Sequence, residues 1–173
     1  MKNREIERKW LVDYKNIPKL PNIPHTEIVQ GYIQNIHGDY IFRLRQCLYF
    51  SSNNSYIGEQ YFQTIKGKSS MIREEYEIEL FKTQFNQLWP LCKDISIHKK
   101  RYEIILEENK IHAYLDFYKN KLDGLYTIEV EFDNEIDCRL FVKPDWFGLE
   151  VTEDLRYTNF KLAIDGIPKQ LTN

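Results

Sequence analysis

The sequence lacks long hydrophobic runs and any closely spaced pair of cysteines. No stretch of its 173 residues approaches the roughly 20 apolar residues that a membrane-spanning helix needs. The first ten residues are charged from the second position and contain no apolar core, which argues against a secretory signal. Cys47, Cys92 and Cys138 are far apart and odd in number, so they indicate neither a zinc site nor a disulfide framework. We therefore expect a cytoplasmic protein with reduced thiols and no membrane partner.

A strong charge of one sign is also missing. The chain has 24 basic and 26 acidic residues and a formal net charge of −2, so its total charge predicts no attraction to nucleic acid. There is no internal repeat, low-complexity segment or shift in composition that would mark a domain boundary. The length fits one folded unit with a substantial core. We therefore predict a single domain over residues 1–173.

Alternation of apolar and polar residues is present along most of the chain, and it predicts a fold dominated by β-strands. Apolar residues at helical spacing predict two or three short helices, from Thr83, near Glu135–Val142 and, as the third, from Asn159. The predicted strands are Asn3–Val12, Thr26–Gln34, Tyr40–Phe50, Gln60–Lys66, Met71–Leu80, Ser96–Glu107, Ile111–Phe117, Leu125–Phe132 and Leu149–Thr152.

Several of these strands have their charges ordered on one face. Same-face neighbours in a strand stand roughly 7 Å apart, so like charges there repel unless an opposite charge lies between them. Carboxylate pairs suit a divalent cation, and basic pairs suit a polyanion. On one strand such a face is typical of a solvated surface, but five strands together favour a closed barrel with a charged interior. The charged faces carry Glu5, Glu7 and Lys9; Arg43 and Arg45; Arg73, Glu75, Glu77 and Glu79; Lys99 and Arg101; Glu129 and Glu131.

The first predicted strand contains the motif that identifies a family resemblance. Glu5-Ile6-Glu7-Arg8-Lys9 matches the ExExK signature of the CYTH superfamily, the triphosphate tunnel metalloenzymes. Further segments resemble that family in the same order, from about residue 3 to residue 165, and the likeness is greatest to its short bacterial-type inorganic triphosphatases. These segments include Arg43-Leu44-Arg45, Lys99-Lys100-Arg101-Tyr102, Glu129-Val130-Glu131-Phe132 and Arg156-Tyr157-Thr158-Asn159.

The resemblance implies a mainly β (α+β) fold: a closed antiparallel eight-stranded β-barrel, or tunnel, with a charged lumen and a few helices packed outside. It also implies that one or two Mg²⁺ or Mn²⁺ ions bind in the lumen, and that the carboxylates Glu129 and Glu131 act in catalysis with Lys9. The implied triphosphate-binding residues are Lys9, Arg43, Arg45, Lys66, Arg73, Lys99 and Arg101, and the implied metal ligands are Glu5, Glu7, Glu129 and Glu131. Glu75, Glu77, Asp116 and Glu150 would each bind metal, position water or orient a basic neighbour.

The reaction that the resemblance implies is hydrolysis of inorganic tripolyphosphate, a small-molecule partner, to pyrophosphate and phosphate. Two alternatives keep the tunnel but change the substrate, namely thiamine triphosphatase and class IV adenylyl cyclase. A thiazolium ring would need an aromatic platform, for which Tyr32, Tyr40, Trp10 and Trp146 are candidates. A third alternative is a non-catalytic polyphosphate-binding module, although pure anion binding has no use for so many lumen carboxylates.

Overall fold

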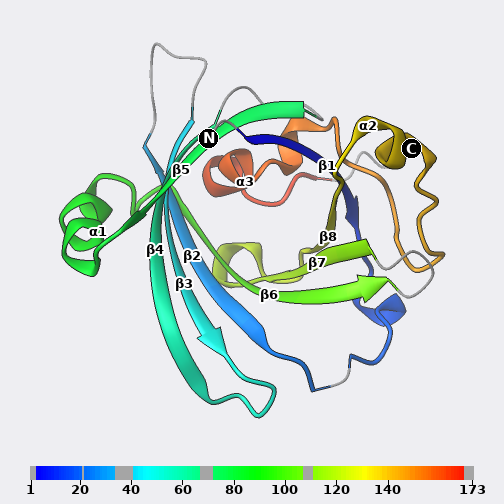
Figure 1. Cartoon of the computed structure of the whole chain (residues 1–173), viewed down its shortest axis with the longest axis horizontal. Coiled ribbons are helices and arrows are strands. Elements are labelled where there is room, and N and C mark those ends of the chain that lie inside the picture. Colours follow the sequence, from blue (N-terminus) through cyan, green and yellow to red (C-terminus); the bar gives the residue numbers. More distant parts are fainter. Residues whose placement is uncertain (1–2, 21, 34–40, 67–71, 107–110, 170–173) are drawn as a thin grey trace.

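The computed structural model describes residues 3–20, 22–33, 41–66, 72–106 and 111–169. Eight strands form the body of the molecule (Figure 1). The strands are β1 (Asn3–Leu11), β2 (His25–Ile33), β3 (Ile41–Phe50), β4 (Tyr56–Lys66), β5 (Ile72–Leu80), β6 (Ser96–Leu106), β7 (Ile111–Tyr118) and β8 (Tyr126–Glu131). The helices are α1 (Lys82–Leu88), α2 (Glu135–Leu140) and α3 (Asn159–Asp165), with 3₁₀ turns η1 (Tyr14–Asn16), η2 (Trp89–Leu91), η3 (Asn120–Leu122) and η4 (Leu155–Tyr157).

All strand pairs are antiparallel, and their order is that of a barrel, β1-β5-β4-β3-β2-β6-β7-β8. The ring is joined at β1, whose two halves pair with different neighbours. Asn3–Ile6 pairs with β5, whereas Glu7–Leu11 pairs with β8. The predicted mainly β, antiparallel eight-stranded architecture is confirmed, but not as a tunnel that is sealed by hydrogen bonds along its whole length.

The second half of β1 has a further neighbour, the segment that follows α2. Leu11 donates to the carbonyl of Leu149 at 2.8 Å, and the amide of Gly148 donates to the carbonyl of Leu11 at 2.8 Å. Sequence alternation predicts a strand over Leu149–Thr152, and that prediction is wrong because the segment is not a regular strand. The segment makes one isolated bridge, between Trp10 and Glu150, and otherwise follows β1 as an irregular chain.

The apolar side chains lie mostly on the outer faces of the strands, where helices and loops cover them. Trp10 is fully buried and contacts the ring of Phe147, with ring centroids 5.1 Å apart. On the opposite wall, Phe85 of α1 packs on Tyr61 of β4 at 4.8 Å. This arrangement leaves the other strand faces, which carry the charges, turned toward the interior.

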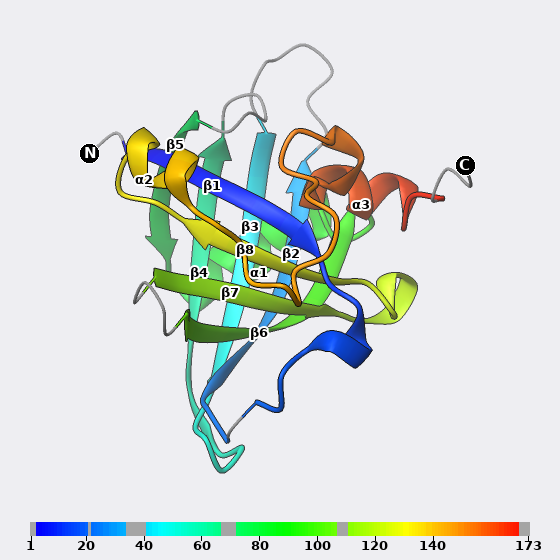
Figure 2. The ribbon, with the colours of Figure 1, turned by 90° about the vertical axis from the view of Figure 1, so that its right-hand side faces the viewer.

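The helix α3 departs from the prediction that the helices pack outside. It lies at one end of the ring of strands, beside β2 and β6 (Figures 1 and 2). Its first residue, Asn159, accepts a 2.6 Å hydrogen bond from the Tyr118 hydroxyl of β7. No helix formed by the described residues is both long and apolar enough to cross a membrane.

Candidate functional site

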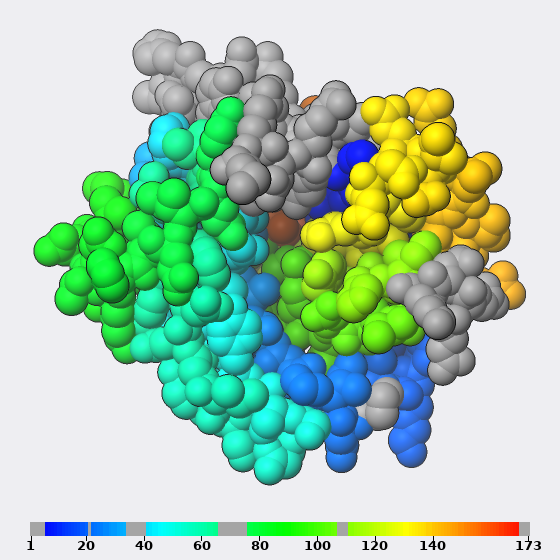
Figure 3. Space-filling model, in the orientation of Figure 1, coloured from blue at the N-terminus to red at the C-terminus, as the bar shows by residue number. Residues whose placement is uncertain are grey.

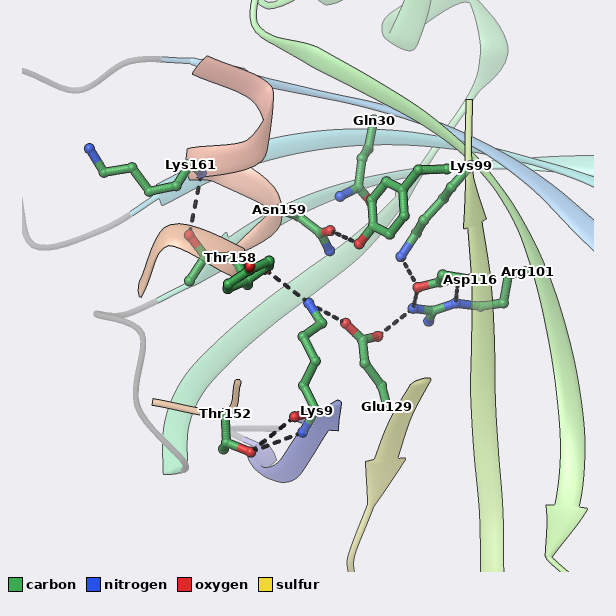
Figure 4. Close-up of polar contacts among 12 residues, drawn as sticks. Lys9, Gln30, Lys99, Arg101, Asp116, Glu129, Thr152, Thr158, Asn159 and Lys161 are labelled. Carbon is green, nitrogen blue, oxygen red and sulfur yellow. Dashed lines mark hydrogen bonds and ion pairs between the residues drawn. The ribbon is translucent and has the colours of Figure 1, made fainter. Parts of the chain in front are cut away.

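A buried network of five charged side chains links β1, β6, β7 and β8 (Figure 4). Lys9 lies opposite Glu129 in the strand register, and its Nζ is 2.7 Å from Glu129 Oε1. The other Glu129 oxygen accepts from Arg101 Nη2 at 2.5 Å. Arg101 also donates two hydrogen bonds to Asp116, at 2.8 and 2.7 Å, and Lys99 Nζ lies 2.5 Å from the same carboxylate. Two carboxylates thus hold three basic groups, and we call these residues the lysine-side cluster.

A second network on β3, β4 and β5 forms the arginine-side cluster. One oxygen of Glu77, Oε2, accepts from Arg43 Nη2 at 3.1 Å and from Arg45 Nη2 at 2.8 Å. The Thr64 hydroxyl donates to that oxygen at 2.8 Å and accepts from Arg43 at 3.0 Å. The guanidinium of Arg45 also stacks over the Phe62 ring, 5.2 Å from its centroid. Both arginines therefore point toward the same carboxylate.

The two clusters face one interior. Burial lowers the pKa of Arg45, and the neighbouring charges of Arg43 and of Arg101, on the opposite wall, lower it further. Burial likewise raises the pKa of Tyr32 to about 12, and that hydroxyl interacts electrostatically with both Arg43 and Lys9. In the space-filling view the molecule is hollowed between the β3–β4 wall and the β7–β8 wall (Figure 3). We refer to this hollow as the lumen.

The two buried lysines of the lysine-side cluster differ in their electrostatic surroundings. Burial opposes the charge of Lys9, but the Glu129 carboxylate and other neighbours outweigh it, so the pKa of Lys9 is above its usual range. Burial and the nearby Arg101 lower the pKa of Lys99 to about 8, because Lys99 shares the Asp116 carboxylate with Arg101. Lys9 is a permanent positive charge near neutral pH, whereas Lys99 titrates close to it.

One end of the lumen has a floor made by the C-terminal segment. The carbonyl of Tyr157 accepts from Lys9 Nζ at 3.3 Å, and Asn159 holds the hydroxyl of Tyr118. Lys99 Nζ lies 5.7 Å from the centroid of the Tyr118 ring. These contacts bring residues that are about 150 positions apart in the chain into one site.

Comparison with known proteins identifies the family. An inorganic triphosphatase of Nitrosomonas europaea is 38% identical over 160 residues, which cover 92% of this chain and 97% of that protein. The chain belongs to the inorganic triphosphatase family. A second member, from Acetivibrio thermocellus, is 32% identical over 165 residues, covering 92% of this chain and 93% of that protein.

A solved structure, described as the inorganic triphosphatase NE1496, superimposes on this chain with a TM-score of 0.65. It is 36% identical and covers 95% of this chain and 97% of its own. No family model matches the sequence. The resemblance to the CYTH superfamily that the sequence motifs indicate is confirmed by these relatives.

Of the carboxylates expected to bind metal, Glu129 belongs to the lysine-side cluster, and Glu7 and Glu131 lie next to it. Glu7 and Glu131 are cross-strand partners, adjacent to the pair formed by Lys9 and Glu129. Glu7 contributes to the raised pKa of Lys9, so the two side chains are within electrostatic reach. The side chain of Glu5 lies outside the described part of the structure. Within the described part, no three His, Cys, Asp or Glu side chains are gathered as a ready-made metal site.

The remaining predicted residues divide into three groups. Asp116 and Glu77 orient basic neighbours, as one reading of the sequence allowed. Glu150 pairs with Arg8 through two hydrogen bonds, of 2.8 and 2.7 Å, and this pairing lowers the pKa of Glu150. It therefore orients a basic residue that sequence alternation places on the opposite strand face from Lys9. The side chains of Lys66, Arg73 and Glu75 lie outside the described residues, although the backbone register sets Arg73 opposite Glu5.

Several site residues escaped the sequence interpretation. Thr64 and Tyr118 contact the charged clusters and Asn159 contacts Tyr118, but hydroxyl and amide side chains are too common to stand out by type. The carbonyl of Tyr157 carries no sequence signal at all, because every residue has one. The segment that contains Tyr157 and Asn159 did match the family pattern, and that match was the available clue.

Proposed function

We propose that this protein hydrolyses a linear triphosphate, inorganic tripolyphosphate, to pyrophosphate and phosphate inside the barrel, with Mg²⁺ or Mn²⁺. The observation that carries the proposal is the pair of facing basic clusters in one lumen, one held by Asp116 and Glu129 and the other by Glu77. A chain of phosphates presents negative oxygens along its whole length, and guanidinium forks match such oxygens. The kinship with inorganic triphosphatases supports the same substrate.

In this proposal the substrate lies between the two walls. On one side it is bound by Arg43 and Arg45. On the other side it is bound by Lys9, Lys99 and Arg101. Phosphoryl transfer requires alignment and charge stabilisation more than covalent help, and prepositioned cations provide both. Lys66 and Arg73 are proposed to extend the arginine-side wall, in keeping with their backbone positions on β4 and β5.

Carboxylates are the ligands that Mg²⁺ and Mn²⁺ prefer, so the donor set beside the lysine-side cluster has the right chemistry, although no three of the described carboxylates are gathered as a metal site. Glu7, Glu129 and Glu131, with Glu5, would hold one or two ions, and a bound ion would supply Lewis acidity at a phosphate oxygen. Glu129 already accepts from Lys9 and Arg101, and each carboxylate oxygen has a second lone pair for a further partner. Glu129 and Glu131 would position the attacking water.

Organic substrates are less well supported by the arrangement of the aromatic residues. Trp10 is packed against Phe141 and Phe147 on the outer face of β1, so it offers no platform in the lumen. Tyr32 is buried, and its hydroxyl accepts a 2.6 Å hydrogen bond from Gln30. Trp146 packs beside Phe147, and Tyr40 lies outside the described residues.

Replacement of Glu129 by glutamine separates an enzyme from a polyphosphate-binding module. We expect Glu129→Gln to lower kcat by about a hundredfold or more, because one metal ligand and the orientation of Lys9 and Arg101 are lost together. Calorimetric binding of tripolyphosphate to the same variant should persist, since one negative charge has been removed from the lumen. Thermal unfolding would be followed in parallel, because breaking a buried ion pair costs about 3–5 kcal/mol.

The matched control is Glu59→Gln. Glu59 is also a strand glutamate, but it pairs with Lys82 and lies on the outer face of β4 with Tyr61. That variant should retain wild-type turnover. Undiminished turnover in Glu129→Gln would remove this residue from the mechanism, and a wild-type protein that binds tripolyphosphate without cleaving it would be a binding module.

A further inference from the structure

The C-terminal segment holds Lys9 at both ends of the residue. At the main chain, the amide of Val151 donates to the carbonyl of Lys9 at 2.8 Å, and the amide of Lys9 donates to Thr152 Oγ1 at 3.0 Å. At the tip of the side chain, Lys9 Nζ donates to the carbonyl of Tyr157. The position of this lysine in the lumen therefore depends on a stretch of chain that is about 140 residues away in sequence.

The preceding residue, Arg8, binds that segment on the outer face of β1. Its guanidinium makes a two-pronged ion pair with Glu150, and its Nη1 donates to the carbonyls of Cys138 and Phe141, both at 3.1 Å. The same guanidinium lies over the ring of Trp10, 4.9 Å from its centroid. Arg8 thus joins β1, the C-terminal half of α2 and the segment around Glu150, and a planar five-donor group is suited to such a junction.

Thr152 connects the outer ion pair to the lumen residue. Its hydroxyl donates to Glu150 Oε1 at 2.8 Å, whereas its distance to the carbonyl of Lys9 is 3.5 Å. A hydroxyl has one proton to donate, and an ionised carboxylate is an acceptor only. The proton therefore goes to Glu150, and a lone pair of the hydroxyl oxygen remains for the amide of Lys9.

We propose that Arg8, Glu150 and Thr152 are positioning residues for hydrolysis, which fix the segment 150–157 on β1 and thereby hold Lys9 toward the substrate. This inference rests on the proposed function. None of the three is proposed to touch the triphosphate. Their effect passes through Lys9, whose side chain is stretched between Glu129 and the Tyr157 carbonyl. A shift of the segment would move that carbonyl and release the ammonium from its place in the lysine-side cluster.

The first test is Glu150→Gln, which keeps the shape of the side chain and removes its charge. We expect kcat/KM for tripolyphosphate to fall about tenfold, a loss typical of residues that orient a group in direct contact with the reaction. The control is Glu135→Gln, which breaks the exposed ion pair with Arg139 on α2. That variant should leave kcat/KM unchanged.

Two conservative substitutions at Thr152 provide a second test, which still decides the question if Glu150→Gln fails to fold. Thr152→Ser keeps the hydroxyl and should retain turnover, whereas the isosteric Thr152→Val removes it and should lower kcat/KM about tenfold. If the Thr152 hydroxyl had only a structural role, the change in kcat/KM of both variants would instead follow the change in their thermal stability. Equal turnover in the serine and valine variants would overturn the proposal.

The decisive measurement is a double-mutant cycle between Glu150→Gln and Lys9→Gln. If Glu150 acts through Lys9, its replacement should have almost no further effect on kcat/KM once Lys9 has been replaced. If the two effects multiply, Glu150 acts independently of Lys9 and the inference is wrong. A wild-type protein without triphosphatase activity would contradict the proposed function, whereas an active wild type with unaffected variants would contradict only this inference.

Discussion

Each buried carboxylate of the lysine-side cluster has two basic partners. Asp116 is fully buried and accepts from both Lys99 and Arg101, and Glu129 accepts from both Arg101 and Lys9. Charges out of water are costly unless they are paired and hydrogen-bonded, and shared carboxylates supply that compensation here. The arrangement leaves one more basic than acidic group in the lysine-side cluster, which an anionic ligand would balance.

The low pKa of Lys99 predicts a specific pH dependence. Because its pKa is about 8, Lys99 is protonated below that pH and loses its charge as the pH rises through it. The affinity for tripolyphosphate, measured by calorimetry in the presence of Mg²⁺, should therefore weaken above about pH 8.

The variant Lys99→Arg is the control for this titration, since arginine stays charged at every pH of interest. Protonation of the ligand itself is common to both proteins and cancels in the comparison. A wild-type profile that runs parallel to that of Lys99→Arg from pH 7 to pH 9.5 would show that Lys99 does not titrate there.

At the scale of elements, β2 and η2 meet at Gly31. A Cβ atom on this residue would lie 2.7 Å from the carbonyl oxygen of Cys92 and 2.9 Å from its sulfur, both closer than a Cβ atom normally comes to a non-bonded atom. Gly31→Ala should therefore lower the free energy of unfolding by about 1–3 kcal/mol, as overpacking does. Urea unfolding followed by circular dichroism measures this change.

Gly58 provides the comparison within β4, because a Cβ there would meet no atom within 4 Å. Gly58→Ala should change the unfolding free energy by less than about 0.5 kcal/mol. Equal effects of the two substitutions would mean that the contact between β2 and η2 is looser than described.

The strands were largely predictable because apolar and polar residues alternate, and that period matches the pleat. The strand predicted over Tyr40–Phe50 is found at Ile41–Phe50, and the one over Met71–Leu80 at Ile72–Leu80. The strand predicted from Gln60 begins earlier, at Tyr56, because pairing with β3 extends it back to the loop that follows Phe50. Leu149–Thr152 has a strand-like pattern, but its geometry is set by docking on β1.

The position of α3 was also beyond sequence reasoning. Its apolar stripe predicts a packing surface, and Leu162 and Ala163 are indeed buried. Periodicity does not reveal whether that surface meets the outside of a barrel or one of its ends. The contact between Asn159 and Tyr118, which places α3 at the floor of the lumen, depends on the whole chain having folded.

For the molecule as a whole, the charged strand faces indicated several of the residues that lie together in the structure, but not how these residues would pair. The basic pairs Arg43/Arg45 and Lys99/Arg101 were evident from spacing alone. That Glu77 serves the first pair and Asp116 the second follows from the register of β4 with β5 and of β6 with β7. A shift of one residue in the strand pairing would turn each carboxylate to the opposite face of the sheet. The spacing of charges along the sequence does not determine this pairing.

A turnover assay that separates the products would show whether the protein cleaves tripolyphosphate in a metal-dependent reaction. The protein would be stripped of metal with a chelator and then supplied with Mg²⁺ or Mn²⁺ and with tripolyphosphate, thiamine triphosphate or ATP. We predict rapid release of phosphate and pyrophosphate from tripolyphosphate, only when metal is added, and far slower turnover of the two organic substrates. Metal-independent turnover, a preference for an organic triphosphate, or formation of cyclic AMP from ATP would rule out the proposed function.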